Sequence, residues 1–202
     1  MIANEITYED TCTVTVIENT STEPEPVPDD YTALNVSTIQ KGQPFTLYND
    51  SLNLNNQTIF ADITLDDSIA LQNVLSVGKI IEEWRAEGST NLHFYYPISL
   101  GDSTRKLRMQ FTAFGSAEER IDVIITNNAL KIALNANGIY VNGTKIDSFY
   151  QSAKFTSFVA QETIKIGSLQ GDTRSKATYN RVGIYNRLLS NEELVTLTSI
   201  DA

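Results

Sequence analysis

The strongest constraint on the fold is an alternation of apolar and polar residues that recurs along most of the chain. A period of two gives an extended segment one apolar and one polar face, as in a half-buried strand. Thr, Ser and Asn together make 55 of the 202 residues, which suits short strands joined by polar turns. We therefore expect an all-β fold. The alternation predicts strands at 34–36, 45–47, 59–65, 92–96, 107–113, 121–125 and 130–134.

Turn signals join these segments into hairpins. Asn142-Gly143, within 140–146, is the dipeptide that type I′ turns favour. Asn127-Asn128 tolerates positive φ and separates two alternating segments. Two later strands are expected at 163–168 and 178–186. Ten or more strands joined in this way predict an antiparallel meander folded as a two-sheet β-sandwich or jelly roll.

Helix signals are confined to two places. Residues 80–87 favour a short helix that carries Trp84. Ser190-Asn191-Glu192-Glu193 has the spacing of a capping box, in which the Ser190 hydroxyl accepts from the third amide and Glu193 reaches back. A short C-terminal helix is therefore expected to run to about Ser199.

The first thirty residues form a separate acidic arm. They hold eight acidic and no basic residues, so eight of the ten net negative charges lie there and the rest of the chain is nearly neutral. Residues 11–17 alternate like a strand, whereas 23–30 stack three prolines and four acids, which favours an extended linker. We divide the chain into an arm, 1–30, and a sandwich body, 31–202.

Composition excludes several function classes. An acidic chain without a Lys or Arg cluster lacks the charge that nucleic acids select, so no nucleic-acid partner is expected. No apolar run is long enough for a membrane span, and residues 1–5 do not resemble a signal peptide. Cys12 and His93 are the single cysteine and histidine, which excludes an intrachain disulfide and multi-His zinc sites. The chain is expected to fold in a reducing cytoplasm.

Three motifs in the C-terminal half resemble those of laminin-G-like, concanavalin A-like lectin and glucanase sandwich domains. Residues 182–194 resemble the closing Ile-Tyr-Asn-Arg strand and acidic capped turn of that family, 139–143 its Tyr-Val-Asn-Gly hairpin, and 164–168 its Ile-Gly-Ser strand end. The resemblance implies a jelly-roll sandwich with a short C-terminal helix. Residues 120–123, Arg-Ile-Asp-Val, stand where the family has a Trp-His pair, so no calcium or glycan ligand is carried over from it.

Hydrolysis is not expected. Glucanases that share this sandwich and retain configuration need two carboxylates about 5–5.5 Å apart, commonly at alternate positions of one strand. No such arrangement occurs, and the acidic cluster at 82–87 fits a solvated helix face better. We therefore expect a non-enzymatic protein that requires no cofactor. Carboxylates at loop rims suit Ca²⁺, so the candidate metal ligands, for a calcium ion, are Asp62, Asp66, Asp67 and Asp172.

Glycan binding would use exposed aromatic rings as stacking platforms. Tyr95 alternates away from Phe94 and Tyr96, which would turn it outward. Each candidate ring fits a position in the core or at a subunit contact equally well. His93 is likewise expected to be an ordinary strand residue rather than a ligand-binding residue. The candidate glycan-binding residues are Trp84, Tyr95, Tyr150 and Tyr179.

Two functions follow from these features. The first is a bacteriophage virion protein, such as a capsid decoration, head fibre or tail appendage, assembled in the host cytoplasm and able to bind host glycans. This hypothesis rests on the family's use in virions and on the missing signal peptide. The arm would add a strand to other virion proteins or to copies of this chain, forming a trimer, or would pair with its own body. The alternative is a bacterial carbohydrate-binding or adhesion module.

Overall fold

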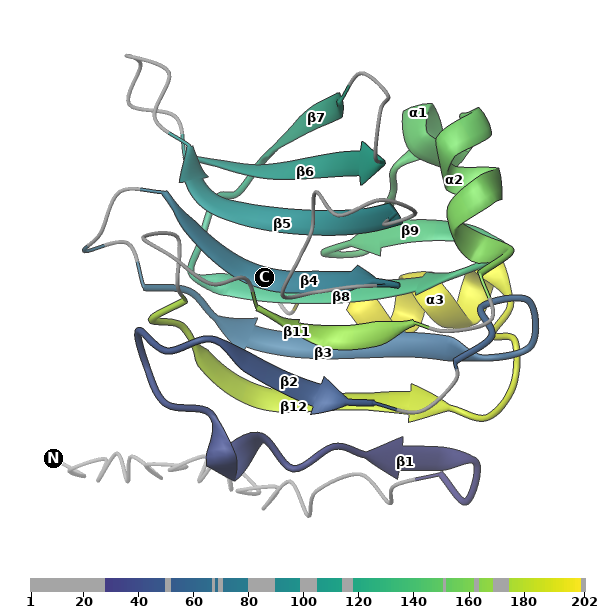
Figure 1. Ribbon diagram of the computed structural model, residues 1–202, viewed down its shortest axis with the longest axis horizontal. Coiled ribbons are helices and arrows are strands. Elements are labelled where there is room, and N and C mark those ends of the chain that lie inside the picture. The colour runs from purple at the N-terminus through teal and green to yellow at the C-terminus, as the bar shows by residue number, and fades with distance from the viewer. Residues whose placement is uncertain are drawn as a thin grey trace, which may run out of the picture.

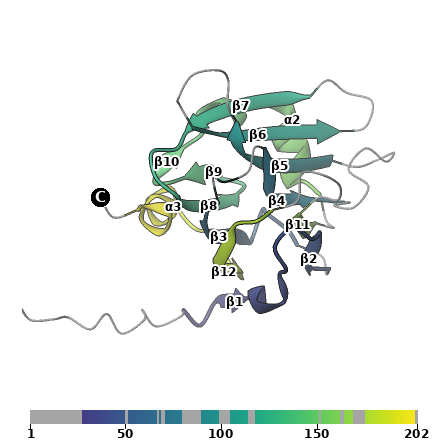
Figure 2. The same ribbon diagram turned by 90° about the vertical axis from the view of Figure 1, so that its left-hand side faces the viewer.

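The computed structural model describes residues 28–49, 52–66, 68, 71–79, 90–98, 105–113, 118–150, 152–161, 164–168 and 175–200. They form two antiparallel six-stranded sheets packed face to face (Figures 1 and 2). The predicted all-β, two-sheet sandwich with a short C-terminal helix is confirmed. Within the described ranges, no helix has the length and apolar character needed to cross a membrane.

Sheet A holds the first and the last strand of the described chain. Its strand order is β1 (Tyr31–Ala33), β12 (Thr178–Tyr185), β3 (Thr58–Thr64), β8 (Ala129–Asn135), β9 (Gly138–Val141) and β10 (Thr144–Lys145). Sheet B runs in the order β2 (Phe45–Tyr48), β11 (Lys165–Ser168), β4 (Gln72–Gly78), β5 (Thr90–Ile98), β6 (Lys106–Ala113) and β7 (Glu119–Ile124).

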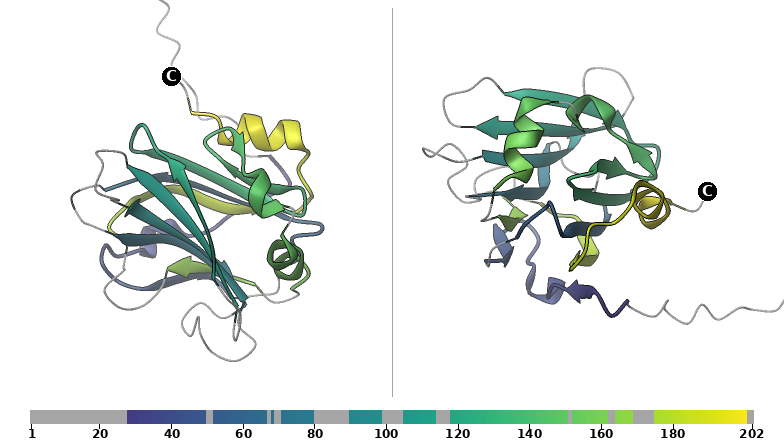
Figure 3. Two further views of the ribbon diagram at one scale, coloured as in Figure 1. Left: turned by 90° about the horizontal axis from the view of Figure 1, so that it is seen from above. Right: turned by 90° about the vertical axis from the view of Figure 1, so that its right-hand side faces the viewer.

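The core lies between the two sheets because alternate residues of each strand point inward. In β3, Ile59, Ala61 and Ile63 are buried there. Two short helices, α1 (Asp147–Tyr150) and α2 (Ala153–Val159), lie together at one end of the sandwich (Figure 3). Phe158 of α2 contacts Phe111 of β6 edge to face, with ring centroids 5.6 Å apart, so α2 closes that end of the core.

A second apolar cluster covers part of the outer face of sheet A. Figure 2 shows α3 (Asn191–Thr198) on the side of sheet A turned away from sheet B. Leu194 of α3 and Leu189, which precedes the helix, pack with residues of β1, β3, β8, β9 and β12, namely Tyr31, Phe60, Ala133, Tyr140 and Tyr185. This cluster anchors α3 against the sheet and leaves a hollow beside it.

The outer face of sheet B carries a buried polar row. Ser76 donates to the Asn73 amide oxygen at 2.9 Å, Ser168 donates to the same oxygen at 3.1 Å, and His93 Nδ1 lies 3.0 Å from Ser76 Oγ. All four side chains are almost completely buried. Burial lowers the pKa of His93 to about 3, so the imidazole is neutral at ordinary pH.

The predicted local signals hold where the chain is described. Asn142 and Gly143 have φ of 48° and 78° and join β9 to β10, which gives the type I′ hairpin. The capping box is present in full at Ser190. The predicted helix at 80–87 and residues 1–27 of the arm lie outside the described residues.

Long-range pairing was not foreseen. Only β4 to β7 and β8 to β10 pair in sequence order, whereas β3 lies between β8 and β12. Strand β4 has no clean alternation because all seven residues are buried, with polar side chains on its outer face. Val36 belongs to a short 3₁₀ helix, η1 (Val36–Thr38), rather than to a strand, because the Asn35 side chain accepts from the Ser37 amide and turns the chain there.

Candidate functional site

A groove of about 990 Å³ runs between the outer face of sheet A and α3. Phe60 and Asp62 of β3, Lys131 of β8 and Arg181 of β12 line the side formed by the sheet. The exposed side of α3 lines the opposite wall, with Glu192, Glu193, Val195, Thr196, Leu197 and Ser199, and Pro28 also contributes to the lining. The volume and the mixture of aromatic, aliphatic and charged groups suit a small ligand.

The central feature of the groove is Arg181. Its guanidinium carbon lies 4.7 Å from the ring centroid of Phe60 and 5.1 Å from that of Tyr31. This geometry is a cation–π contact on two rings, which holds the planar group in place without using its N–H donors. Within the described residues the Arg181 side chain donates no hydrogen bond and joins no ion pair.

A β-bulge places Arg181 in the groove. The pairing of β12 with β3 shifts between Tyr179, opposite Ile63, and Arg181, opposite Asp62. Strict alternation would send Tyr179 and Arg181 to the same face. The extra residue lets Tyr179 enter the core while Arg181 turns to the outer face, which is the usual effect of a bulge on side-chain direction.

Gly183 makes room for the aromatic floor. A Cβ at this position would lie 2.3 Å from Tyr31 Oη and 2.5 Å from the Thr32 carbonyl oxygen. Tyr31 therefore lies directly over the glycine, and its ring also approaches Tyr185, with centroids 4.8 Å apart. Burial raises the pKa of Tyr31 to about 12, so the phenol is neutral.

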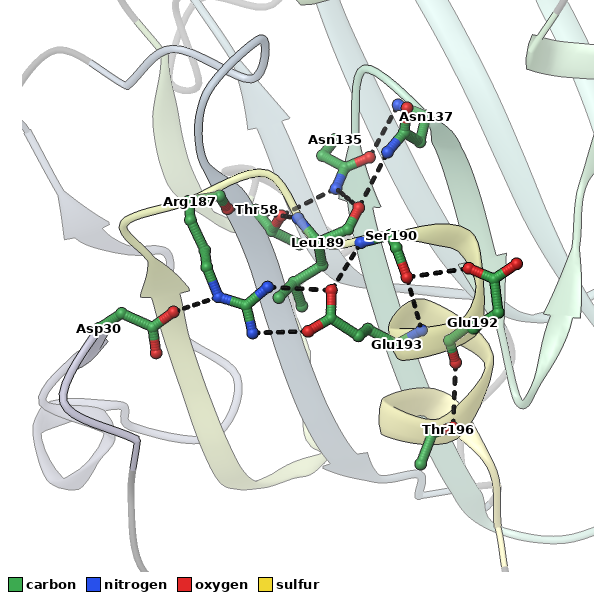
Figure 4. A network of polar contacts seen from close by, with 10 residues as sticks. All are labelled: Asp30, Thr58, Asn135, Asn137, Arg187, Leu189, Ser190, Glu192, Glu193 and Thr196. Carbon is green, nitrogen blue, oxygen red and sulfur yellow. Dashed lines mark hydrogen bonds and ion pairs between the residues drawn. The ribbon is translucent and has the colours of Figure 1, made fainter.

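At the rim, Arg187 is fully engaged. Its Nε donates to Asp30, and its terminal nitrogens contact the Glu193 carboxylate at 2.7 and 2.9 Å (Figure 4). The Ser190 amide also donates to Glu193 at 2.8 Å. The Arg187 guanidinium is the main reason that the pKa of Glu193 falls to about 2. Because two carboxylates satisfy Arg187, it has little left to offer a ligand.

The corner between β12 and α3 is held by amide side chains. Asn135 and Asn137 both donate to the Leu189 carbonyl, at 3.1 and 2.9 Å, and the Leu189 amide donates to Thr58 Oγ1 at 3.0 Å (Figure 4). On the sheet side, Lys131 Nζ donates to the Ser199 carbonyl at 2.9 Å, which places a positive charge at the C-terminal end of α3. The groove wall is therefore a fixed surface.

Solved sialidase structures superpose on this chain, although no protein-family model and no curated protein matches it. Leech intramolecular trans-sialidase gives a TM-score of 0.48 at 15% identity, over 86% of this chain and 27% of the enzyme. The Ruminococcus gnavus IT-sialidase CBM40, bound to α2,3 sialyllactose, gives 0.44 at 17% identity, over 80% of this chain and 98% of the module. Trypanosoma rangeli sialidase in complex with sialic acid gives 0.47 at 20% identity, over 72% of this chain and 23% of the enzyme.

The chain thus spans about a quarter of the length of the two enzymes and nearly all of the module. Strand order and register define the sandwich independently of these likenesses, and we draw no function from them.

The two aromatic candidates whose side chains the structure describes, Tyr95 and Tyr179, lie on different faces of the molecule's sheets. Tyr95 lies on the outer face of sheet B, 8% exposed, with its ring 6.0 Å from His93. Tyr179 lies in the core, also 8% exposed, and its hydroxyl donates to the Val74 carbonyl. Tyr150 ends α1, and Trp84 lies outside the described residues. For Tyr179 the structure gives the core position that the sequence had left open.

Of the candidate calcium ligands, the structure describes Asp62 and Asp66, and each is engaged in a different local contact. Asp62 lies in the groove, and its carboxylate accepts from the side-chain amide of Asn180 at 2.9 Å. Asp66 accepts from the Ser68 amide at 2.9 Å in a local turn, and this contact with Ser68 lowers the pKa of Asp66. Asp67 and Asp172 lie outside the described residues. Among the described residues, no three His, Cys, Asp or Glu side chains gather as metal ligands.

Sequence reasoning missed Arg181, Phe60 and Tyr31 as site residues. Phe60 occupies a position that the predicted strand at 59–65 assigns simply to one face, Tyr31 precedes every strand predicted in the body, and the bulge that redirects Arg181 has no residue signature. One signal was present: a glycine inside a strand, here Gly183, often marks the close approach of another group.

Proposed function

We propose that this protein is a non-catalytic glycan-binding module whose groove beside α3 holds an acidic sugar. The observation that carries the proposal is Arg181, which is stacked on Phe60 and Tyr31 and donates no hydrogen bond to any residue that the structure describes. A guanidinium in this state presents a fixed fork to a carboxylate, which is its best-matched partner.

The rest of the groove suits the remainder of a sugar. Asp62 has a second carboxylate oxygen beyond the one that accepts from Asn180, so it can accept from a hydroxyl. The hydroxyls of Thr196 and Ser199 donate to carbonyls of α3 and keep lone pairs for a ligand. Val195, 40% exposed, adds an apolar surface for the carbon face of a ring.

The test compares an acidic and a neutral probe. We expect 3′-sialyllactose, which carries a carboxylate, to bind the full chain, and lactose, which lacks it, to bind far more weakly. Arg181→Ala should weaken binding of 3′-sialyllactose by ten- to a hundredfold in calorimetry, because a hydrogen bond to a charged group is worth about 1.5–3 kcal/mol.

Arg120→Ala is the matched control, since it removes an exposed arginine on β7 in sheet B that pairs with Glu118. Arg181→Lys keeps the charge but not the fork, and is expected to bind with intermediate strength while unfolding at the wild-type temperature. Equal affinity of wild type and Arg181→Ala for the probe would contradict the proposal.

A bacteriophage virion component remains our second candidate, together with the laminin-G-like family, the host-cytoplasm assembly and the trimer inferred from the sequence. The observation that favours it is the place of β1, which follows the arm directly and forms one edge of sheet A. A strand from another copy or another virion protein can add at such an edge. The corresponding measurement is the oligomeric state of the full chain.

A further inference from the structure

We propose that residues 23–27 of the arm, Glu-Pro-Glu-Pro-Val, bind in the groove of their own chain, with a glutamate carboxylate on Arg181. The segment would then act as an internal competitor for the acidic ligand. This inference uses the same groove as the proposed function, but its decisive measurement needs no glycan.

The chain enters the groove at a fixed point. Pro28 lines the groove, and its carbonyl accepts from the Tyr31 amide at 2.9 Å, which closes a turn over Asp29 and Asp30. Asp30 is held twice, by the Asn186 amide on its carbonyl at 2.7 Å and by Arg187 on its carboxylate. The described chain therefore begins at the groove, with Pro28.

The arm carries the negative charges that could pair with Arg181. Residues 1–27 contain six acids and no base. Glu25 and Glu23 are three and five residues before Pro28, so an extended chain carries them about 10 and 17 Å from it. A tether this short gives an effective concentration on the order of millimolar, which favours the chain's own segment over a free one.

The same segment is a poor partner for the edge of β1 that pairs with no strand among the described residues. Prolines 24, 26 and 28 lack the backbone N–H, and these are alternate positions of the chain. Alternate N–H groups of a strand point to the same edge, so this edge would have no donors for pairing with β1. Asp29 and Asp30 also have negative φ, as in an ordinary type I turn rather than the type I′ turn that hairpins favour. A turn of this type splays the two flanking strands apart, which disfavours pairing of the preceding segment with β1. An extended proline-rich segment instead suits a groove with aromatic and aliphatic walls, here Phe60, Tyr185 and Val195.

The experiment follows the Arg181 Nε–H resonance in the full chain by NMR. The double variant Glu23→Gln, Glu25→Gln removes both nearby carboxylates and should shift this resonance. The matched control, Glu5→Gln with Glu9→Gln, removes the same charge at positions much farther from Pro28 in sequence and should leave it unchanged. Arg181→Ala should in turn shift the Val27 amide. An Arg181 Nε–H resonance that is identical in wild type and the Glu23, Glu25 double variant would overturn the inference.

Dilution distinguishes the chain's own arm from that of a second copy. Binding within one chain predicts a shift that is independent of protein concentration and a monomer in sedimentation. A shift that disappears on dilution together with an oligomer would overturn the inference in favour of exchange between copies.

Glycan binding supplies a separate readout. If 3′-sialyllactose binds, the Glu23, Glu25 double variant should bind it several-fold more tightly than wild type, and the control variant should not. If the probe binds no variant, the proposed function fails, while the Arg181 resonance still decides whether the arm occupies the groove.

Discussion

Arg181 and Gly183 illustrate how single residues create a site on a sheet face that alternation alone would leave plain. The bulge at Asn180 turns Arg181 outward, and Gly183, two residues later, leaves the space that Tyr31 fills. Tyr31 and Phe60 then support the guanidinium from below. Losing the bulge, the glycine or either ring would change where the Arg181 guanidinium lies. The groove therefore depends on these close contacts more than on the number of charged residues that line it.

Gly183→Ala tests that dependence. The added Cβ would lie 2.4 Å from Tyr31 Cζ as well as 2.5 Å from the Thr32 carbonyl, so both the ring and β1 must move. Overpacking of this kind costs about 1–3 kcal/mol of unfolding free energy. Urea denaturation measures it, and Val195→Ile, which adds one methylene at an exposed position, serves as the control. A Gly183→Ala protein as stable as wild type would show that Tyr31 is not held over the glycine.

Among the elements, α3 is positioned by its first turn rather than by its length. The Ser190 hydroxyl accepts from the Glu193 amide, and Glu193 reaches back to the Ser190 amide and across to Arg187. Arg187 in turn holds Asp30, so one carboxylate links the helix start to the chain at the groove rim. Each contact lies near the surface, where ion pairs contribute little singly. Their combined effect is to fix the angle at which α3 leaves β12.

Ser190→Ala should therefore loosen α3 without unfolding the sandwich. Loss of an N-cap side chain costs about 1 kcal/mol, and it should appear as faster amide hydrogen exchange at Leu194 and Val195.

The variant Glu193→Gln addresses the pH dependence of α3 stability. Because the pKa of Glu193 is lowered to about 2 in the folded state, its contribution is complete above the unfolded value near 4.5 and is lost as the pH falls towards 2.

The acid-induced loss of α3 protection between pH 4.5 and 2 should consequently be smaller in Glu193→Gln than in wild type. Glu119→Gln, on β7 of the other sheet, provides the comparison. An identical pH profile for wild type and Glu193→Gln would refute the role of this carboxylate.

At the scale of the whole molecule, the sequence predicted the local turns and helix caps but not the pairing of strands that are far apart in the chain. The Asn142-Gly143 hairpin and the Ser190 capping box depend on neighbours in sequence, and both were predicted. The pairing of β3 with β12 and the bulge at Asn180 depend on segments more than a hundred residues apart. Strand β4 was missed because its outer face is polar yet buried, so the usual contrast between faces is absent. The groove arises from these long-range contacts, which is why Arg181, Phe60 and Tyr31 were not foreseen as site residues.

The buried polar row on sheet B gives the molecule a pH response that is separate from the carboxylates. His93 is the single histidine, and burial lowers its pKa from 6.5 to about 3. Below pH 6.5 the unfolded chain therefore binds a proton that the folded protein excludes, so stability falls as the pH drops from 6.5 towards 3. Between pH 6.5 and 5, before carboxylates titrate, the expected loss is roughly 1.5 kcal/mol.

Urea unfolding at pH 6.5, 5.75 and 5 measures this loss, and His93→Gln should abolish most of the pH dependence in that window whatever its stability at neutral pH. The imidazole of the folded wild type should also keep its neutral NMR shifts at pH 5. A protonated imidazole at pH 5 in the folded protein would mean that the layer around His93, Ser76 and Asn73 admits water, and the buried polar row would then be an open surface of sheet B.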